Sequence, residues 1–417
     1  MSLFAGVISV KGIAFLMFSL FVITAIGYAL GRITVKGINL GTAGVFIIAL
    51  LYGALFSQQI NSTVVQTLAD GSTVSIASNA LKIVENLGLI LFVTSVGFIA
   101  GPNFFKNLKQ NYKSYIVLGL IIILSGGAAC LGCYAVGKGS AENSKEFVAI
   151  LVGILSGSLT STPAFASAKA TVPEYEDAVT VGYGIAYLFG VIGVVLFVQL
   201  MPRLTKANMD EERKKIAVVD TGAEKKEYKG KLIDMDEFGF MPFALAVIIG
   251  IVVGAIKIPM SSKGLSGTTF SLTTTGGTLL TALVFGHFGH IGKMNLKVEK
   301  RVLEVFREFG LMLFLIGAGV AGGVKFIEYF KAVYFVYGVI MTVVPMIAGY
   351  LFAKYVLKLS LLNNLGSITG GMTSTPALGT LINVAGTDDV ASAYAATYPI
   401  ALIAVVIVSQ LICTLVG

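Results

Sequence analysis

The sequence contains no tryptophan, two histidines and three cysteines, and only 12% of its residues are charged. A soluble domain carries about 25% charged residues, so this chain has too few to keep its whole surface in water. Because tryptophan is missing, any aromatic belt at a membrane interface must come from the 16 tyrosines.

The few residues suited to metal or redox chemistry do not form a recognisable site. Cys130 and Cys133 make a C-x-x-C pair, but they lie inside an apolar run with no second pair. That placement is typical of small membrane-helix residues rather than of a redox or metal site. His287 and His290 could share one side of a helix, but two ligands are too few for zinc. We expect no metal and no other cofactor.

Apolar residues, in contrast, are abundant: they make up 56% of the chain, and its mean hydropathy is +0.87. A membrane-spanning helix needs roughly 20 residues, and ten apolar runs reach or approach that length with their flanks. They are 13–30, 40–56, 87–100, 115–136, 178–201, 240–256, 275–288, 310–323, 332–356 and 390–415. The sequence predicts an all-α polytopic membrane protein.

The net charge of +8 is spread over short loops between the apolar runs, which does not favour nucleic-acid binding. The segment between the halves is polar and carries both signs of charge, but it is too short for a sizeable soluble or enzymatic domain. We predict an N-terminal membrane repeat over 1–201, a linker over 202–238 and a C-terminal membrane repeat over 239–417.

The most informative motif occurs once in each half. GILSGSLTSTPAFASA begins at Gly153 and GSITGGMTSTPALGTL begins at Gly366, and both contain Thr-Ser-Thr-Pro-Ala after two glycines. Further matches run in order along both halves. A duplicated polar element, broken by proline and set in membrane-embedded halves, is typical of the substrate site of a secondary transporter.

Threonine directly before proline is a helix-start signal, because the hydroxyl caps the helix and proline suits its first turn. The N–H groups left free at such a start attract carboxylates. The predicted substrate-binding residues are Thr160, Ser161, Thr162, Pro163, Ala164, Thr373, Ser374, Thr375, Pro376 and Ala377. The alternative is that each motif is only a kink whose hydroxyls bond to their own helix.

Other duplicated residues have a packing role as their default interpretation. Gly153, Gly157, Gly366 and Gly370 are predicted to let the helices around the motif pack tightly. The pairs Tyr183/Tyr187 and Tyr394/Tyr398 are four residues apart, lie on one helix face and could face the motifs. Glu85 and the group Glu304, Arg307 and Glu308 precede matching apolar runs. They indicate interfacial ion pairs, or else a gating role.

Two topologies fit the apolar runs. If each motif segment spans the membrane, each half crosses six times; if it is re-entrant, each half crosses five times and the halves insert oppositely. The second arrangement places most of the 30 Lys and Arg on the cytoplasmic side, as the positive-inside rule requires. We therefore predict an inverted-topology repeat of about five transmembrane helices and one re-entrant hairpin per half, with both chain ends outside and the linker in the cytoplasm.

The paired G-x-x-x-G-x-x-T-S-T-P-A elements resemble the aspartate:alanine exchanger family of bacterial membrane carriers. The resemblance covers nearly the whole chain except its centre, where many members carry a soluble regulatory module that is missing here. It implies exchange of small anionic or zwitterionic carboxylates, such as aspartate, alanine or succinate, across the bacterial inner membrane.

An elevator-type movement of the motif-bearing bundle against fixed helices is the expected mechanism, and a homodimer would supply the fixed part. A sodium- or proton-coupled carboxylate symporter remains an alternative, because two-hairpin inverted repeats also resemble glutamate:sodium symporters. A channel or a non-transporting scaffold is a third possibility, although a channel needs a continuous polar lining.

Overall fold

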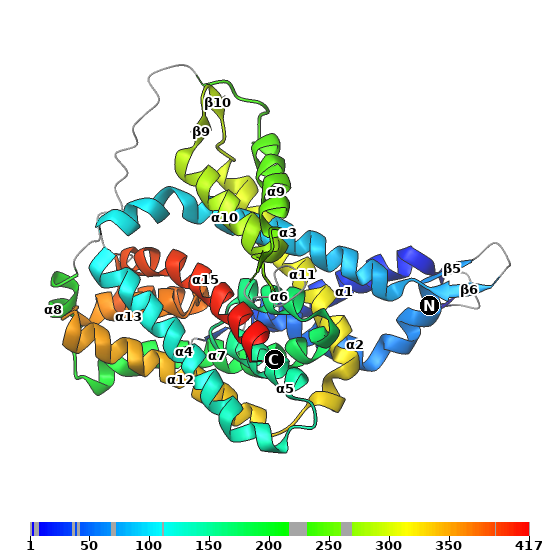
Figure 1. The fold of residues 1–417 in the computed structure, drawn as a ribbon, viewed down its shortest axis with the longest axis horizontal. Helices are drawn as coiled ribbons and strands as arrows, with labels where there is room; N and C mark the ends of the chain where they lie inside the picture. The colour runs from blue at the N-terminus through cyan, green and yellow to red at the C-terminus, as the bar shows by residue number, and fades with distance from the viewer. Residues whose placement is uncertain are drawn as a thin grey trace. The chain divides into compact units, whose positions relative to one another are not determined.

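The computed structural model describes all residues except 1, 4–7, 36–37, 40–41, 68–71, 111, 217–231, 260–268, 388 and 417. Helices make up most of the chain (Figure 1). The chain forms two compact units, Met1–Phe92 with Glu308–Phe330, and Val93–Arg307 with Lys331–Gly417. Each unit therefore combines segments from both halves of the sequence.

The first unit is built from long apolar helices. Its elements are α1 (Gly12–Gly31), α2 (Ala43–Thr63), the start of α3 (Ala77–Gln110) and the end of α11 (Lys300–Tyr329), with the antiparallel strand pairs β1 (Ser2–Leu3) and β2 (Ile8–Ser9), β3 (Thr34–Val35) and β4 (Ile38–Asn39), and β5 (Val65–Thr67) and β6 (Thr73–Ser75). Glycines allow helices of this unit to approach closely. A Cβ on Gly88 of α3 would lie 2.6 Å from the carbonyl oxygen of Gly310 in α11, so these helices cross with their backbones touching.

The second unit holds the remaining elements, which include both motif copies. They are the end of α3, the π-helical turn η2 (Tyr112–Ile116), α4 (Val117–Gly137), η3 (Lys138–Ser140), α5 (Ser144–Ser158), α6 (Thr162–Thr171), η4 (Pro173–Tyr175), α7 (Glu176–Leu204), α8 (Met209–Lys214), α9 (Phe240–Gly254), β7 (Ile258–Pro259) paired with β8 (Thr269–Phe270), α10 (Thr273–Phe288), β9 (His290–Ile291) paired with β10 (Met294–Asn295), the start of α11, α12 (Val333–Leu351), η6 (Phe352–Val356), α13 (Leu361–Gly371), α14 (Thr375–Ala385) and α15 (Val390–Leu415).

Within the described residues, eight helices are long and apolar enough to cross a membrane. They cover Gly12–Gly31, Gly44–Thr63, Ala77–Pro102, Ser114–Gly137, Pro173–Leu204, Lys300–Val324, Val333–Val356 and Val390–Leu415. The described residues of all ten predicted apolar runs lie in helices, apart from one or two at the ends of some runs, but the other two runs form α9 and α10, with only 15 and 16 residues. By length alone, eight of the ten predicted spans are therefore supported.

Near the end of the linker, the side chain of Asp236 binds backbone N–H groups at the start of α9. Asp236 accepts hydrogen bonds from the backbone N–H groups of Phe238, Gly239, Phe240 and Met241, at 2.6 to 3.0 Å. These bonds, above all the one from Met241, lower the pKa of Asp236 from its usual value although partial burial opposes the shift. A negative charge at this position also suits the positive end of the helix.

Candidate functional site

The first Thr-Ser-Thr-Pro-Ala copy forms the turn between α5 and α6, which we call the first tip (residues 159–164). The N–H of Thr160 bonds to the carbonyl oxygen of Gly157 at 2.9 Å, and that of Ser161 to Ser156 at 2.8 Å. This pair of bonds is a Schellman ending, which usually places glycine in the left-handed conformation. Here threonine takes that place, since Thr160 has φ of 52°.

The second copy forms the same turn between α13 and α14, which we call the second tip (residues 372–377). The N–H of Thr373 bonds to Gly370 at 3.0 Å and that of Ser374 to Thr369 at 2.9 Å. Thr373 has φ of 50°. A β-branched residue with positive φ is rare, so its occurrence at the same place in both tips indicates that the threonine side chain has a purpose there.

That purpose is contact between the tips. The hydroxyl of Thr160 donates to the carbonyl oxygen of Met372 at 2.9 Å, and the hydroxyl of Thr373 donates to that of Leu159 at 2.8 Å. Leu159 and Met372 follow the last residues of α5 and α13, where carbonyl groups lose their helical partners. Each tip therefore caps the helix that leads into the other tip.

The predicted substrate-binding residues lie in the two tips, and among those whose side chains are described, all but Pro376 are buried. Thr160 and Thr373 are each 8% exposed, Thr162 is 5% exposed, and Ser161 and Ser374 are 1% and 0% exposed. The residues in the first turns of α6 and α14 are Pro163, Ala164, Pro376 and Ala377. Thr375 begins α14, and its side chain lies outside the described part of the structure.

One tyrosine pair faces the first tip directly. The hydroxyl oxygens of Tyr183 and Thr162 are 3.3 Å apart. The Tyr183 ring stacks on Phe165 of α6 at 4.1 Å between centroids and on Tyr187 at 4.9 Å. In α15, Tyr394 and Tyr398 stack on each other at 5.0 Å. The duplicated pairs thus form stacked rings in both halves, and Tyr183 reaches a tip hydroxyl.

The motif glycines lie where neighbouring helices touch. A Cβ on Gly157 would lie 2.7 Å from the carbonyl oxygen of Tyr183, and one on Gly153 would collide with that of Val179. In the other half, a Cβ added to Gly366 or to Gly370 would lie 2.6 Å from a carbonyl oxygen in α15. The glycines therefore hold α5 against α7 and α13 against α15 at backbone contact.

Sequence reasoning missed two features of α6. Lys169 is 7% exposed and lies 5.7 Å over the ring of Phe165. Ser167 is fully buried and accepts a 2.7 Å hydrogen bond from the side-chain amide of Gln410 in α15, a helix of the other half. The signal for Lys169 was available in the sequence, because a lone charge next to an apolar motif is a candidate functional residue. No local pattern links Ser167 to Gln410.

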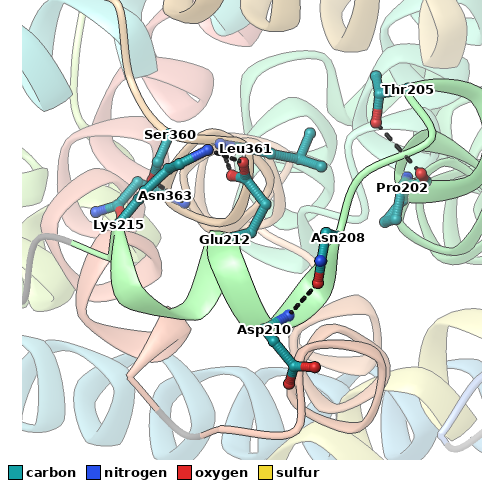
Figure 2. A network of polar contacts seen from close by, with 9 residues as sticks. All are labelled: Pro202, Thr205, Asn208, Asp210, Glu212, Lys215, Ser360, Leu361 and Asn363. Atoms are coloured by element: carbon teal, nitrogen blue, oxygen red, sulfur yellow. Dashed lines mark hydrogen bonds and ion pairs between the residues drawn. The ribbon is translucent and has the colours of Figure 1, made fainter.

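The linker helix α8 was also missed as part of this region; it contacts both helices of the second tip, α13 and α14. Figure 2 shows its contact with the start of α13. Glu212 accepts a 3.0 Å hydrogen bond from the N–H of Leu361 at the start of α13. Arg213 donates at 2.8 Å to the carbonyl oxygen of Ala385 at the end of α14. Glu212 also bonds to Lys215 at 2.9 Å and raises the pKa of that lysine. Each charge suits the helix end that it meets.

Two of the remaining charged candidates have described contacts. Glu85 is 9% exposed and packs against Gly317, and Glu304 pairs with Lys300 at 3.7 Å on an exposed face. Among the residues that the structure describes, no three His, Cys, Asp or Glu side chains gather where a metal could bind. The three free cysteines are buried.

Comparison with known proteins places the sequence among membrane permeases. A family model described as "Predicted Permease Membrane Region" matches residues 19–203 and 242–414. A protein of Bacteroides thetaiotaomicron named "Uncharacterized transporter" is 26% identical, with 95% of this chain and 97% of that protein aligned. Similarly named proteins of Bacteroides fragilis and Desulfotalea psychrophila are 26% and 22% identical, over 96% and 95% of this chain and 98% and 96% of their own lengths.

The break in the family match, between residues 203 and 242, coincides with the linker. The alignment with the Bacteroides thetaiotaomicron protein extends over 554 positions, more than the 417 residues of this chain. That protein therefore contains stretches that have no counterpart here.

Proposed function

Because this chain belongs to the family of predicted permease membrane regions and is a multi-pass membrane transporter, we propose that it exchanges small carboxylates across the bacterial inner membrane. The substrates would be amino acids such as aspartate or alanine, or C4 dicarboxylates such as succinate. The contact of the two tips carries this proposal, because it joins the two buried turns that precede α6 and α14. Helix N-termini favour carboxylates through their free N–H groups and positive dipole ends.

The geometry of the contact supports an inverted repeat. Thr160 bonds to the tip that contains Thr373 and Thr373 bonds back in the same way, as a twofold axis would produce. Each tip joins helices of 15 and 10, or 11 and 11, residues. Such helices are shorter than the ~20 residues of a full span, so we propose that each pair is a re-entrant hairpin. Inverted repeats with broken helices place the substrate site near the bilayer midplane.

The wider proposal follows from this arrangement. The linker is cytoplasmic and both chain ends are outside. The bundle that carries the tips moves as an elevator against the other helices, in a homodimer. The extra alignment positions of the Bacteroides relative support the absence here of a soluble regulatory module that family members carry. In this proposal the chain has no enzymatic role.

Counterflow in proteoliposomes tests the proposal. Vesicles that contain the purified chain and unlabelled succinate, aspartate or alanine should accumulate the same labelled compound faster than empty vesicles do. Net efflux into substrate-free buffer should be slow, since moving empty tips exposes unsatisfied N–H groups to apolar surroundings, which costs several kcal/mol each. Fast efflux at zero membrane potential, without an ion gradient, would contradict obligatory exchange. Uptake that requires sodium would indicate the symporter instead.

A further inference from the structure

The two tips share one backbone conformation but differ in the serine before each new helix. Ser161 has φ and ψ of −99° and 96°, and Ser374 has −97° and 93°. Both serines occupy the N-cap position, whose side chain normally accepts a hydrogen bond from the first turn of the helix. The difference between the two tips therefore lies in side chains and not in the backbone.

The first tip satisfies its own polar groups. The hydroxyl of Ser161 accepts a 3.4 Å hydrogen bond from the N–H of Ala164, so α6 has a side-chain cap. The next hydroxyl, that of Thr162, is 3.3 Å from the hydroxyl of Tyr183. The stacked ring of Phe165 lies over Tyr183. This tip presents no buried hydroxyl without a hydrogen-bonding partner among its described residues.

The second tip leaves its cap open. The hydroxyl of Ser374 is fully buried and has no hydrogen-bonding partner among the described residues. The first turn of α14 has no side-chain cap and no acidic residue. Ala377, which corresponds to Ala164, is also fully buried. The second tip thus combines a buried hydroxyl donor with an uncapped helix start, whereas the equivalent helix start in the first tip is capped.

A carboxylate is the ligand that satisfies both features. Its oxygens accept from the serine hydroxyl and from backbone N–H groups, and its negative charge suits the positive end of an 11-residue helix. An ammonium or amide N–H could not accept from either donor. We propose that the carboxylate of the substrate is held at the second tip, by Ser374 and the first turn of α14, while the first tip is a structural counterpart that is closed to it. This assignment rests on the proposed function.

Two matched variants of the full chain test the assignment. Ser374→Gly and Ser161→Gly each remove one hydroxyl, and glycine is itself tolerated at an N-cap. Binding is measured on the purified protein with whichever of succinate, aspartate or alanine the parent binds most tightly. Ser374→Gly should weaken that binding about 10-fold or more, because a hydrogen bond to a charged group is lost. Ser161→Gly should weaken binding less than Ser374→Gly does, because the Ser161 hydroxyl is already engaged by the N–H of Ala164.

Two further measurements keep the outcome decisive. Ser374→Thr retains the hydroxyl and should bind as the parent does. The fully amidated form of the same ligand, in which every carboxylate is replaced by an amide, should not compete. If Ser374→Gly binds like the parent, or if Ser161→Gly is the weaker variant, the assignment is wrong while the proposed function stands. If the folded parent binds and exchanges none of the three carboxylates, the proposed function and the assignment both fail.

Discussion

At the scale of single residues, the tips depend on two threonines in a conformation that threonine rarely takes. A non-glycine residue in the left-handed region costs on the order of 1–3 kcal/mol. Glycine would avoid that cost at Thr160 and Thr373, but it would supply no hydroxyl for the opposite tip. Losing the donor leaves a buried carbonyl unpaired, at about 1–3 kcal/mol. The two costs are similar, and the threonine hydroxyl provides a contact between the tips that glycine could not.

Thr160→Val should therefore lower the free energy of unfolding by about 1–3 kcal/mol, because the valine keeps the strained backbone and leaves the carbonyl of Met372 unpaired. Thr160→Ser keeps the donor and should be close to the parent. Thermal unfolding of the detergent-purified protein measures both. Equal losses for Val and Ser would show that the hydroxyl is unimportant and that the methyl group matters.

At the scale of helices, the packing of α5 on α7 depends on backbone contact at Gly153. The neighbour is a carbonyl oxygen, which cannot move aside as a flexible side chain could. By contrast, Gly132 in α4 is exposed and has open space where a Cβ would stand. The chain thus offers a buried and an exposed helical glycine for direct comparison.

Gly153→Ala should destabilise the protein by about 1–3 kcal/mol or more, because the added methyl group forces α5 and α7 apart. Gly132→Ala should cause no loss, since alanine favours helix over glycine. Unfolding temperature and expression of the two variants are compared side by side. A loss of stability for both would mean that helix flexibility, and not packing, accounts for the effect.

The linker helix α8 contacts both helices of the second tip, α13 and α14. Besides the bonds of Glu212 and Arg213, the side chains of Met209 and Ile216 pack against a buried cluster of Val198, Leu362, Leu365, Leu381 and Ala385. The two helices of the second tip, α13 and α14, are thus held at both ends: by hydrogen bonds to the first tip at the turn, and by hydrogen bonds to α8 at the opposite end.

Glu212→Ala should speed hydrogen exchange at the start of α13, because the N–H of Leu361 loses its acceptor and the helix loses a favourable charge. The neighbouring exposed residue offers the control, and Glu211→Ala should leave that exchange unchanged. Mass spectrometry of peptides from residues 357–366 measures both variants. Unchanged exchange in Glu212→Ala would mean that α8 does not hold α13.

At the scale of the whole molecule, the proposed inverted repeat predicts which parts of the chain face each side of the membrane. In a variant whose three native cysteines are replaced by alanine, Lys214→Cys should react only with reagent on the cytoplasmic side. Ser2→Cys and Lys138→Cys should react only from outside. The positive-inside rule is the physical reason, since it would place the Lys and Arg residues of the linker in the cytoplasm. Labelling of positions 2 and 214 from the same side would overturn the inverted topology.

The sequence by itself determined the helical class and the positions of the helices. All ten apolar runs are helical over nearly all of their described residues, because backbone groups in an apolar environment must bond within their own segment. It also located both tips, since α6 and α14 begin at Thr162 and Thr375. The predicted cap was wrong: the N-cap is the serine before each threonine, and only Ser161 makes the capping bond. The family resemblance was confirmed at the level of a transporter family, whereas the substrate and the mechanism stay predictions.

Only the tertiary structure decided which groups meet across long separations. Thr160 finds the carbonyl of Met372 at a distance of 212 residues in sequence, and Ser167 finds Gln410 at 243. The two serines differ in the same way, because Ser161 and Ser374 stand in nearly the same motif and yet only one caps its helix. Such contacts depend on how all the helices of the unit pack, and packing is not encoded in any single window of residues.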